Sequence, residues 1–162
     1  MRSSAWIWVF TTQETDTAAL ALALEQSLAD ILGGRARVVV LSRDELARVV
    51  ADNPYADEPN PRAVHTIFLG EDPGPELAEE VAAVERQAAR KGGRDAARVV
   101  GRAIFLHTPD GYGRSELAAV LARGGSGRSA AATGTARNWA TVTKLLSMCD
   151  ADRRRPPAAS PA

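Results

Sequence analysis

The stretch RVVGRAIFLH, residues 98–107, decides the fold that the sequence predicts. Two short apolar runs, residues 98–100 and 103–106, flank Gly101-Arg102, and a two-residue loop that contains glycine is typical of a tight β-hairpin. Strands joined by such a loop are antiparallel. Together with the helices predicted around it, this hairpin favours an α+β fold with an open mixed or antiparallel sheet covered by helices, rather than a Rossmann domain.

Two strands and two helices are predicted in the first third of the chain. Residues 5–10 are apolar at every position, which predicts a strand buried on both faces at the centre of the sheet. Leucines at helical spacing from Leu20, followed by Gly33-Gly34, predict a helix. Residues 37–41 have the pattern of a second strand. Ser42 and Glu45 form a capping-box pattern that starts the next helix.

The central part of the sequence predicts a loop, a strand and a third helix. Residues 52–62 are rich in Pro, Asp and Asn and are expected to form a surface loop. A strand over residues 64–69 follows it. The third helix begins near Pro75, places Leu77, Val81 and Val84 on one face, and stops at Gly92-Gly93.

Two short helices are expected after the hairpin, separated by the Gly/Ser-rich residues 123–134. One begins around Arg114. The other spans residues 136–148, with Thr135 as N-cap and with Trp139, Val142, Leu146 and Cys149 on its apolar face. A single domain is expected over residues 1–149, with a disordered tail at residues 150–162.

The composition excludes several classes of protein. No apolar run approaches the roughly 20 residues of a membrane span, and no signal peptide is evident, so we expect a cytoplasmic protein without membrane association. One cysteine and two histidines argue against a disulfide and against a zinc site. No cofactor is expected. Residues 1–97 carry 10 basic against 16 acidic residues, and residues 98–162 carry 10 against 4.

This basic C-terminal half contains the candidate ligand site. HTPDGYGRSEL, residues 107–117, places a glycine-containing turn before a predicted helix, where backbone N–H groups would surround a small anion. Arg114 and Arg137 would each lie in the first turn of a helix, an unfavourable position that an anion, a partner or Asp110 would relieve. The alternative is an ordinary turn capped by Ser115 and, for the line Arg137, Thr141 and Lys144, a solvated helix face. The candidate ligand-binding residues are His107, Asp110, Gly111, Gly113, Arg114, Ser115, Arg137, Asn138, Thr141 and Lys144.

Several of these strings resemble one protein family. VVGRAIFLH, HTPDGYGRSEL and TARNWATVTKLL look like the C-terminal hallmark of the bacterial domain-of-unknown-function family 1697. LSRDELARVVADNPY and VHTIFL are similar to its middle, so the resemblance covers about residues 4–148. It implies two ferredoxin-like halves, here residues 4–70 and 71–149, and no assigned activity. Glu116, Ala136 and Ala140 depart from the family's usual lysine, threonine and asparagine.

A larger departure concerns the N-terminus, because members of the family usually begin with a further strand, a glycine-containing loop and a helix. This chain starts at the strand that follows them, so the resemblance implies an N-terminally truncated member with an incomplete first half. Apolar surface would then need cover, for instance by dimerisation. A misassigned start codon is the other explanation.

Three functions are compatible with these features. The first is a binding module for an anionic ligand, either a small phosphate-bearing molecule or a nucleic acid. The second is a structural or regulatory protein that acts through protein–protein contact. The third is a hydrolase or transferase that uses His107, Asp110 and Ser115 on phosphoryl or acyl groups, although no catalytic motif identifies an enzyme.

Overall fold

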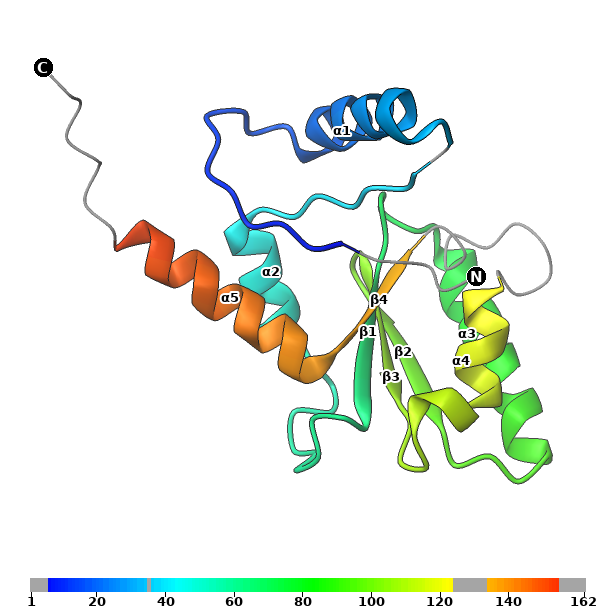
Figure 1. The fold of residues 1–162 in the computed structure, drawn as a ribbon. Helices are drawn as coiled ribbons and strands as arrows, with labels where there is room; N and C mark the ends of the chain where they lie inside the picture. Colours follow the sequence, from blue (N-terminus) through cyan, green and yellow to red (C-terminus); the bar gives the residue numbers. More distant parts are fainter. Residues whose placement is uncertain (1–5, 35, 124–133, 155–162) are drawn as a thin grey trace, which may run out of the picture.

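A computed structural model describes residues 6–34, 36–123 and 134–154 of the chain, and they form an α+β structure around one four-stranded antiparallel sheet (Figure 1). The strand order is β2-β3-β1-β4. Helices α3 and α4 cover one face of the sheet, and α2 and α5 cover the other. None of the described helices is long and apolar enough to cross a membrane.

The predicted hairpin forms one half of this sheet. β2 (Ala96–Val100) and β3 (Ala103–His107) are joined by Gly101-Arg102, and Gly101 adopts a φ of +53° that the tight loop requires. β1 (Val64–Phe68) pairs with β3 on one side and with β4 (Thr135–Asn138) on the other. The expected strand over residues 64–69 is therefore confirmed to within one residue.

The larger core lies between the sheet and the pair α3 (Pro75–Arg90) and α4 (Glu116–Ala122). The predicted helix start at Pro75 is confirmed, and Leu77 and Val81 are buried against the sheet while Val84 is partly buried. Fully buried side chains from the sheet and from α4 meet here, among them Ile104, Leu106, Leu117 and Leu121.

A smaller core lies on the opposite face, under α2 (Arg43–Ala51) and α5 (Trp139–Arg153). Leu46, Phe68 and Val142 are buried there, and Trp139 is partly buried against them. The predicted capping box of α2 is present: Glu45 N–H donates to Ser42 Oγ at 3.2 Å, and Ser42 N–H donates to Glu45 Oε2 at 2.7 Å.

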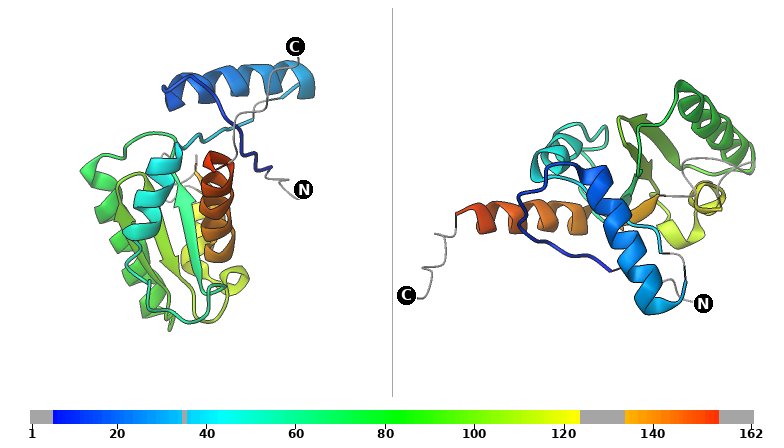
Figure 2. Two further views of the ribbon diagram at one scale, coloured as in Figure 1. Left: turned by 90° about the vertical axis from the view of Figure 1, so that its left-hand side faces the viewer. Right: turned by 90° about the horizontal axis from the view of Figure 1, so that it is seen from above.

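The first third of the chain differs from the prediction. Residues 6–10 form no strand, and all five are exposed instead of buried. Residues 37–41 also form no strand. A strand needs a neighbour for its backbone hydrogen bonds, and the described residues supply none to either segment. The helix α1 (Thr17–Leu32) forms as predicted and ends at Gly33, yet it contains no buried residue and stands apart from the sheet (Figure 2).

The C-terminal part also corrects the prediction. Residues 135–138 form the strand β4, so α5 begins at Trp139 with Asn138, not Thr135, as its N-cap. Asn is at least as good a helix cap as Thr. Residues 135–138 pair with β1 along the edge that β3 does not occupy, so they join the sheet instead of the helix. α5 extends to Arg153, so residues 150–153 are helical rather than disordered. The expected linker at 124–133 and the tail at 155–162 lie outside the described residues.

Candidate functional site

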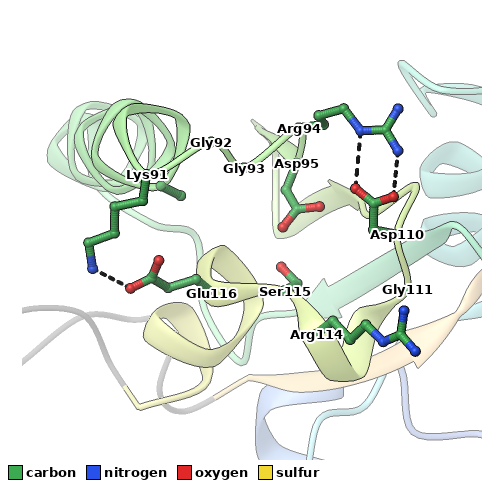
Figure 3. Close-up of a pocket in the computed structure, with 11 residues that line it drawn as sticks. Lys91, Gly92, Gly93, Arg94, Asp95, Asp110, Gly111, Arg114, Ser115 and Glu116 are labelled. Atoms are coloured by element: carbon green, nitrogen blue, oxygen red, sulfur yellow. Dashed lines mark hydrogen bonds and ion pairs between the residues drawn. The ribbon is translucent and has the colours of Figure 1, made fainter.

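A polar pocket of about 240 Å³ lies where the end of α3 approaches the turn between β3 and α4 (Figure 3). Its charged lining residues come from both segments. They are Lys91, Arg94, Asp95, Asp110, Arg114 and Glu116. Four of the ten predicted ligand residues therefore contribute to one pocket: Asp110, Gly111, Arg114 and Ser115.

Two of the cations at this pocket are neutralised by carboxylates. Arg94 donates from Nε to Asp110 Oδ2 at 3.1 Å and from its terminal nitrogen to Oδ1, and Lys91 pairs with Glu116. The hydrogen bonds and the charge of Arg94, and after them the charge of Arg114, lower the pKa of Asp110. Such exposed pairs contribute little to stability. Arg114, the third cation that lines the pocket, takes part in none of the described ion pairs.

Arg114 does not occupy the position that the sequence predicts for it. It ends a short 3₁₀ turn, η1 (Tyr112–Arg114), and Ser115 follows as the N-cap of α4. Ser115 is buried, and its Oγ accepts a hydrogen bond from Ala118 N–H at 2.9 Å. The unfavourable position in a first helical turn is thus wrong for Arg114, and the first turn of α4 instead carries Glu116, which the helix dipole favours.

Arg137 lies elsewhere, in β4, opposite Thr66 of β1. Its guanidinium donates to the Ala136 carbonyl at 2.6 Å, and burial lowers its pKa. The first-turn position is therefore wrong for Arg137 as well, because Asn138 caps α5 by accepting from Thr141 N–H at 2.8 Å. Arg137 does not line the pocket beside Arg114.

The side chain of His107 contacts two residues of the loop that precedes β1. Its Nε2 lies 2.6 Å from Glu58 Oε2, and the ring of Tyr55 stacks on it with centroids 5.3 Å apart. The backbone N–H of Asn60, and then His107, lower the pKa of Glu58. The described contacts do not join His107 to Ser115, whose hydroxyl serves as a helix cap. The nucleophile–base geometry that the hydrolase or transferase hypothesis requires is absent from them.

The sequence did not reveal Tyr55 and Glu58 as partners of His107, because they lie about 50 positions away in a loop. The run NPYADE, which places an aromatic ring and carboxylates in that loop, is the one signal that marks it. Gly113 lies within η1. In the described residues no group of three His, Cys, Asp or Glu side chains is arranged to hold a metal ion.

A second, apolar depression of about 390 Å³ lies between residues 6–10 and α5. Ile7 and Val9 face Leu145 and Met148 across it, and Thr141 and Lys144 also line it, so the last two predicted ligand residues belong to an apolar groove. The aromatic residues Trp6, Trp8 and Phe10 alternate along the chain with Ile7 and Val9. Each aromatic side chain is more exposed than Ile7 or Val9.

Five of the nine exposed large apolar side chains of the described residues lie in this segment, and Met148 lines the groove beside it. We call these six residues the N-terminal apolar surface: Trp6, Ile7, Trp8, Val9, Phe10 and Met148. The other three, Leu22, Ile31 and Leu32, lie on α1. The sequence prediction missed this surface because it assigned residues 5–10 to a buried strand.

A family model described as "Protein of unknown function (DUF1697)" matches residues 8–105, from Trp8 to the middle of β3. No curated protein and no solved structure matches the chain. The match covers more than half of the chain and ends before the pocket-forming turn at residues 110–116. On this match, the chain belongs to the DUF1697 family of proteins of unknown function.

Proposed function

We propose that this protein acts through contact with another protein chain, and that the N-terminal apolar surface is the contact. Single exposed apolar side chains are common on proteins, but contiguous groups of them mark interaction sites. Here five consecutive residues, 6–10, are all exposed, and Trp6 reaches 74%. This run of five is the observation that carries the proposal.

The amount of exposed aromatic surface supports it. At roughly 150–250 Å² per aromatic side chain, the exposed fractions of Trp6, Trp8 and Phe10 leave about 270–450 Å² of ring surface in water. At about 25 cal/mol per Å², covering it would release about 7–11 kcal/mol before the entropy of association is subtracted. The rings alone reach the size of the largest patch on a typical monomer.

Site-specific photo-crosslinking in the cells that produce the protein tests this proposal. A benzophenone amino acid replaces Trp8 in one variant and Gln87, an exposed residue of α3, in the matched control. We expect a discrete crosslinked product from position 8 and none from position 87. Equal yields from the two positions, or no product from position 8, would contradict the proposal.

Binding of a small anion at the polar pocket is a second candidate, favoured by the position of Arg114. Arg114 lines the pocket beside Arg94 and Lys91 and takes part in none of the described ion pairs. An anionic group such as a phosphate, whether in a small ligand or in a nucleic acid, would complement it.

Titration calorimetry with inorganic phosphate, a nucleoside triphosphate and a short oligonucleotide tests this second candidate. We expect Arg114→Gln to abolish binding and the control Arg137→Gln to retain it, with affinity falling as salt is added. If the unsubstituted protein binds none of the three, anion binding is wrong.

A further inference from the structure

We infer that the polar pocket takes a small zwitterion, a molecule whose anionic group is held by Arg114 and whose ammonium group is held by Asp95. This inference rests on the anion binding that is the second candidate function of the protein. It adds a second charge to the ligand and a further residue, Asp95, to the site.

The charged residues that line the pocket are balanced in number. Three are cations and three are carboxylates. Four of these six form the two ion pairs described above, and the remaining two, Arg114 and Asp95, take part in none of the described ion pairs. A ligand that carried only negative charge would be attracted by Arg114 but repelled by Asp95. A ligand with one charge of each sign would satisfy both residues.

The positions of the side chains leave the middle of the pocket to Asp95. Figure 3 shows the two ion pairs at opposite sides of the pocket and Asp95 between them, with its carboxylate directed toward Ser115. Asp95 lies in the segment that joins α3 to β2, whereas Arg114 ends η1. The two unpaired charges therefore come from different walls of the pocket, and a ligand that met both would bridge these walls.

Side chains, rather than backbone N–H groups, are left to hold such a ligand. The sequence predicts a turn whose N–H groups surround an anion, but in the structure these groups bond within the chain. The N–H of Gly111 donates to the Thr108 carbonyl at 2.9 Å, and the N–H of Arg114 donates to the Gly111 carbonyl at 3.0 Å. On the other wall, the N–H groups of Gly92 and Gly93 donate to carbonyls in the last turn of α3. Recognition therefore depends on the two unpaired charges.

The size and lining of the pocket favour a small polar ligand. Its volume of about 240 Å³ is below the range of roughly 300–1,000 Å³ that is typical of sites for drug-sized molecules. Among the described lining residues, only Ala88 has an apolar side chain. The affinity of a ligand is therefore expected to depend on its charges, and little on the burial of apolar surface.

Titration calorimetry with a matched pair of probes tests the second charge of the ligand. O-Phosphoethanolamine carries a phosphate and an ammonium group, and ethyl phosphate is the same molecule without the ammonium group. We expect the unsubstituted protein at low salt to bind O-phosphoethanolamine at least about fivefold more tightly than ethyl phosphate. The physical reason is the charge-assisted hydrogen bond between the ammonium group and Asp95, which is partly buried.

Substitutions at Asp95 assign this preference to its carboxylate. Asp95→Asn is expected to abolish the preference, so that the dissociation constants of the two probes agree within about twofold. Asp95→Glu keeps the charge and is expected to keep the preference. The matched control Asp57→Asn removes an exposed carboxylate from the loop before β1, outside the pocket, and is expected to change nothing. Thermal unfolding checks that all three variants are folded.

The possible results separate this inference from the anion binding on which it rests. Equal binding of the two probes by the unsubstituted protein would overturn the inference and leave anion binding intact. A preference that persists in Asp95→Asn would also overturn it, because another group would then hold the ammonium. If neither probe binds, the inference is wrong, and the titration with inorganic phosphate decides the second candidate function separately.

Discussion

His65 is a histidine whose burial has a consequence for stability. Its ring lies 4.2 Å from that of Tyr112, its Nδ1 is buried without a hydrogen-bond partner among the described residues, and burial lowers its pKa from the ordinary value of 6.5. The unfolded chain therefore takes up a proton on this histidine at a higher pH than the folded chain does. The contribution of His65 to stability is complete above the ordinary pKa and is lost as the pH falls toward the lower, folded-state value.

Replacing His65 by Phe is expected to remove this loss while keeping a ring against Tyr112. Urea unfolding of both proteins at about pH 7.5 and about pH 5.5 measures it, because only the difference between the two pH profiles reports on His65. We expect the free energy of unfolding to fall less for the variant. Identical slopes for the two proteins would show that His65 is not buried in its neutral form.

Ser115 is expected to act as a helix cap and not as a nucleophile. Its buried Oγ accepts from Ala118 N–H, so Ser115→Ala should lower the free energy of unfolding by about 0.5–2 kcal/mol. Ser115→Asp keeps a capping acceptor and is the matched control, with a smaller loss. The urea midpoint measures both, and an unchanged midpoint for the alanine variant would rule out the cap.

At the scale of the element, the sequence predicted those features whose cause is local. The capping box of Ser42 and Glu45, the stop at Gly33 and the loop at Gly101 each depend on residues a few positions apart, and all three are present. Whether residues 6–10 or 37–41 form strands depends on a pairing partner elsewhere in the chain. Propensity alone does not supply that information.

In the candidate site, too, the local features were predictable from the sequence and the tertiary contacts were not. Ser115 was identifiable as a cap because the N–H that it accepts from lies three residues away. Arg114 and Arg137 shared a predicted position, yet a register between β1 and β4 places Arg137 opposite Thr66 and away from the pocket. The partners of His107, Tyr55 and Glu58, are likewise brought to it by tertiary structure.

Gly101 offers a test of the hairpin on which the sheet depends. Its φ of +53° is in the left-handed region, and a Cβ at this position would meet no atom within 4 Å, so Gly101→Ala adds backbone strain without a steric clash. We expect a loss of about 1–2 kcal/mol for alanine and less for Gly101→Asn, since Asn tolerates this conformation better. Thermal unfolding of the two variants checks the order, and equal stability of the alanine variant would contradict it.

At the scale of the whole molecule, stability is distributed unevenly. The sheet, α3 and α4 share the larger core, whereas α1 has no buried residue in the described structure. Regions with few buried apolar contacts open at low free energy. In the purified protein, the amides of α1 should therefore exchange with solvent much faster than those of β1 and β3. Equal protection of α1 and the central strands would show that α1 is packed within a single chain.

The central claim is that residues 6–10 contact another protein chain, and crosslinking from this segment measures that contact most directly. A benzophenone amino acid at position 8 should give a discrete crosslinked product in the cells that produce the protein, and the same group at the exposed position 87 should give none. Equal yields from the two positions, or no product from position 8, would contradict the claim.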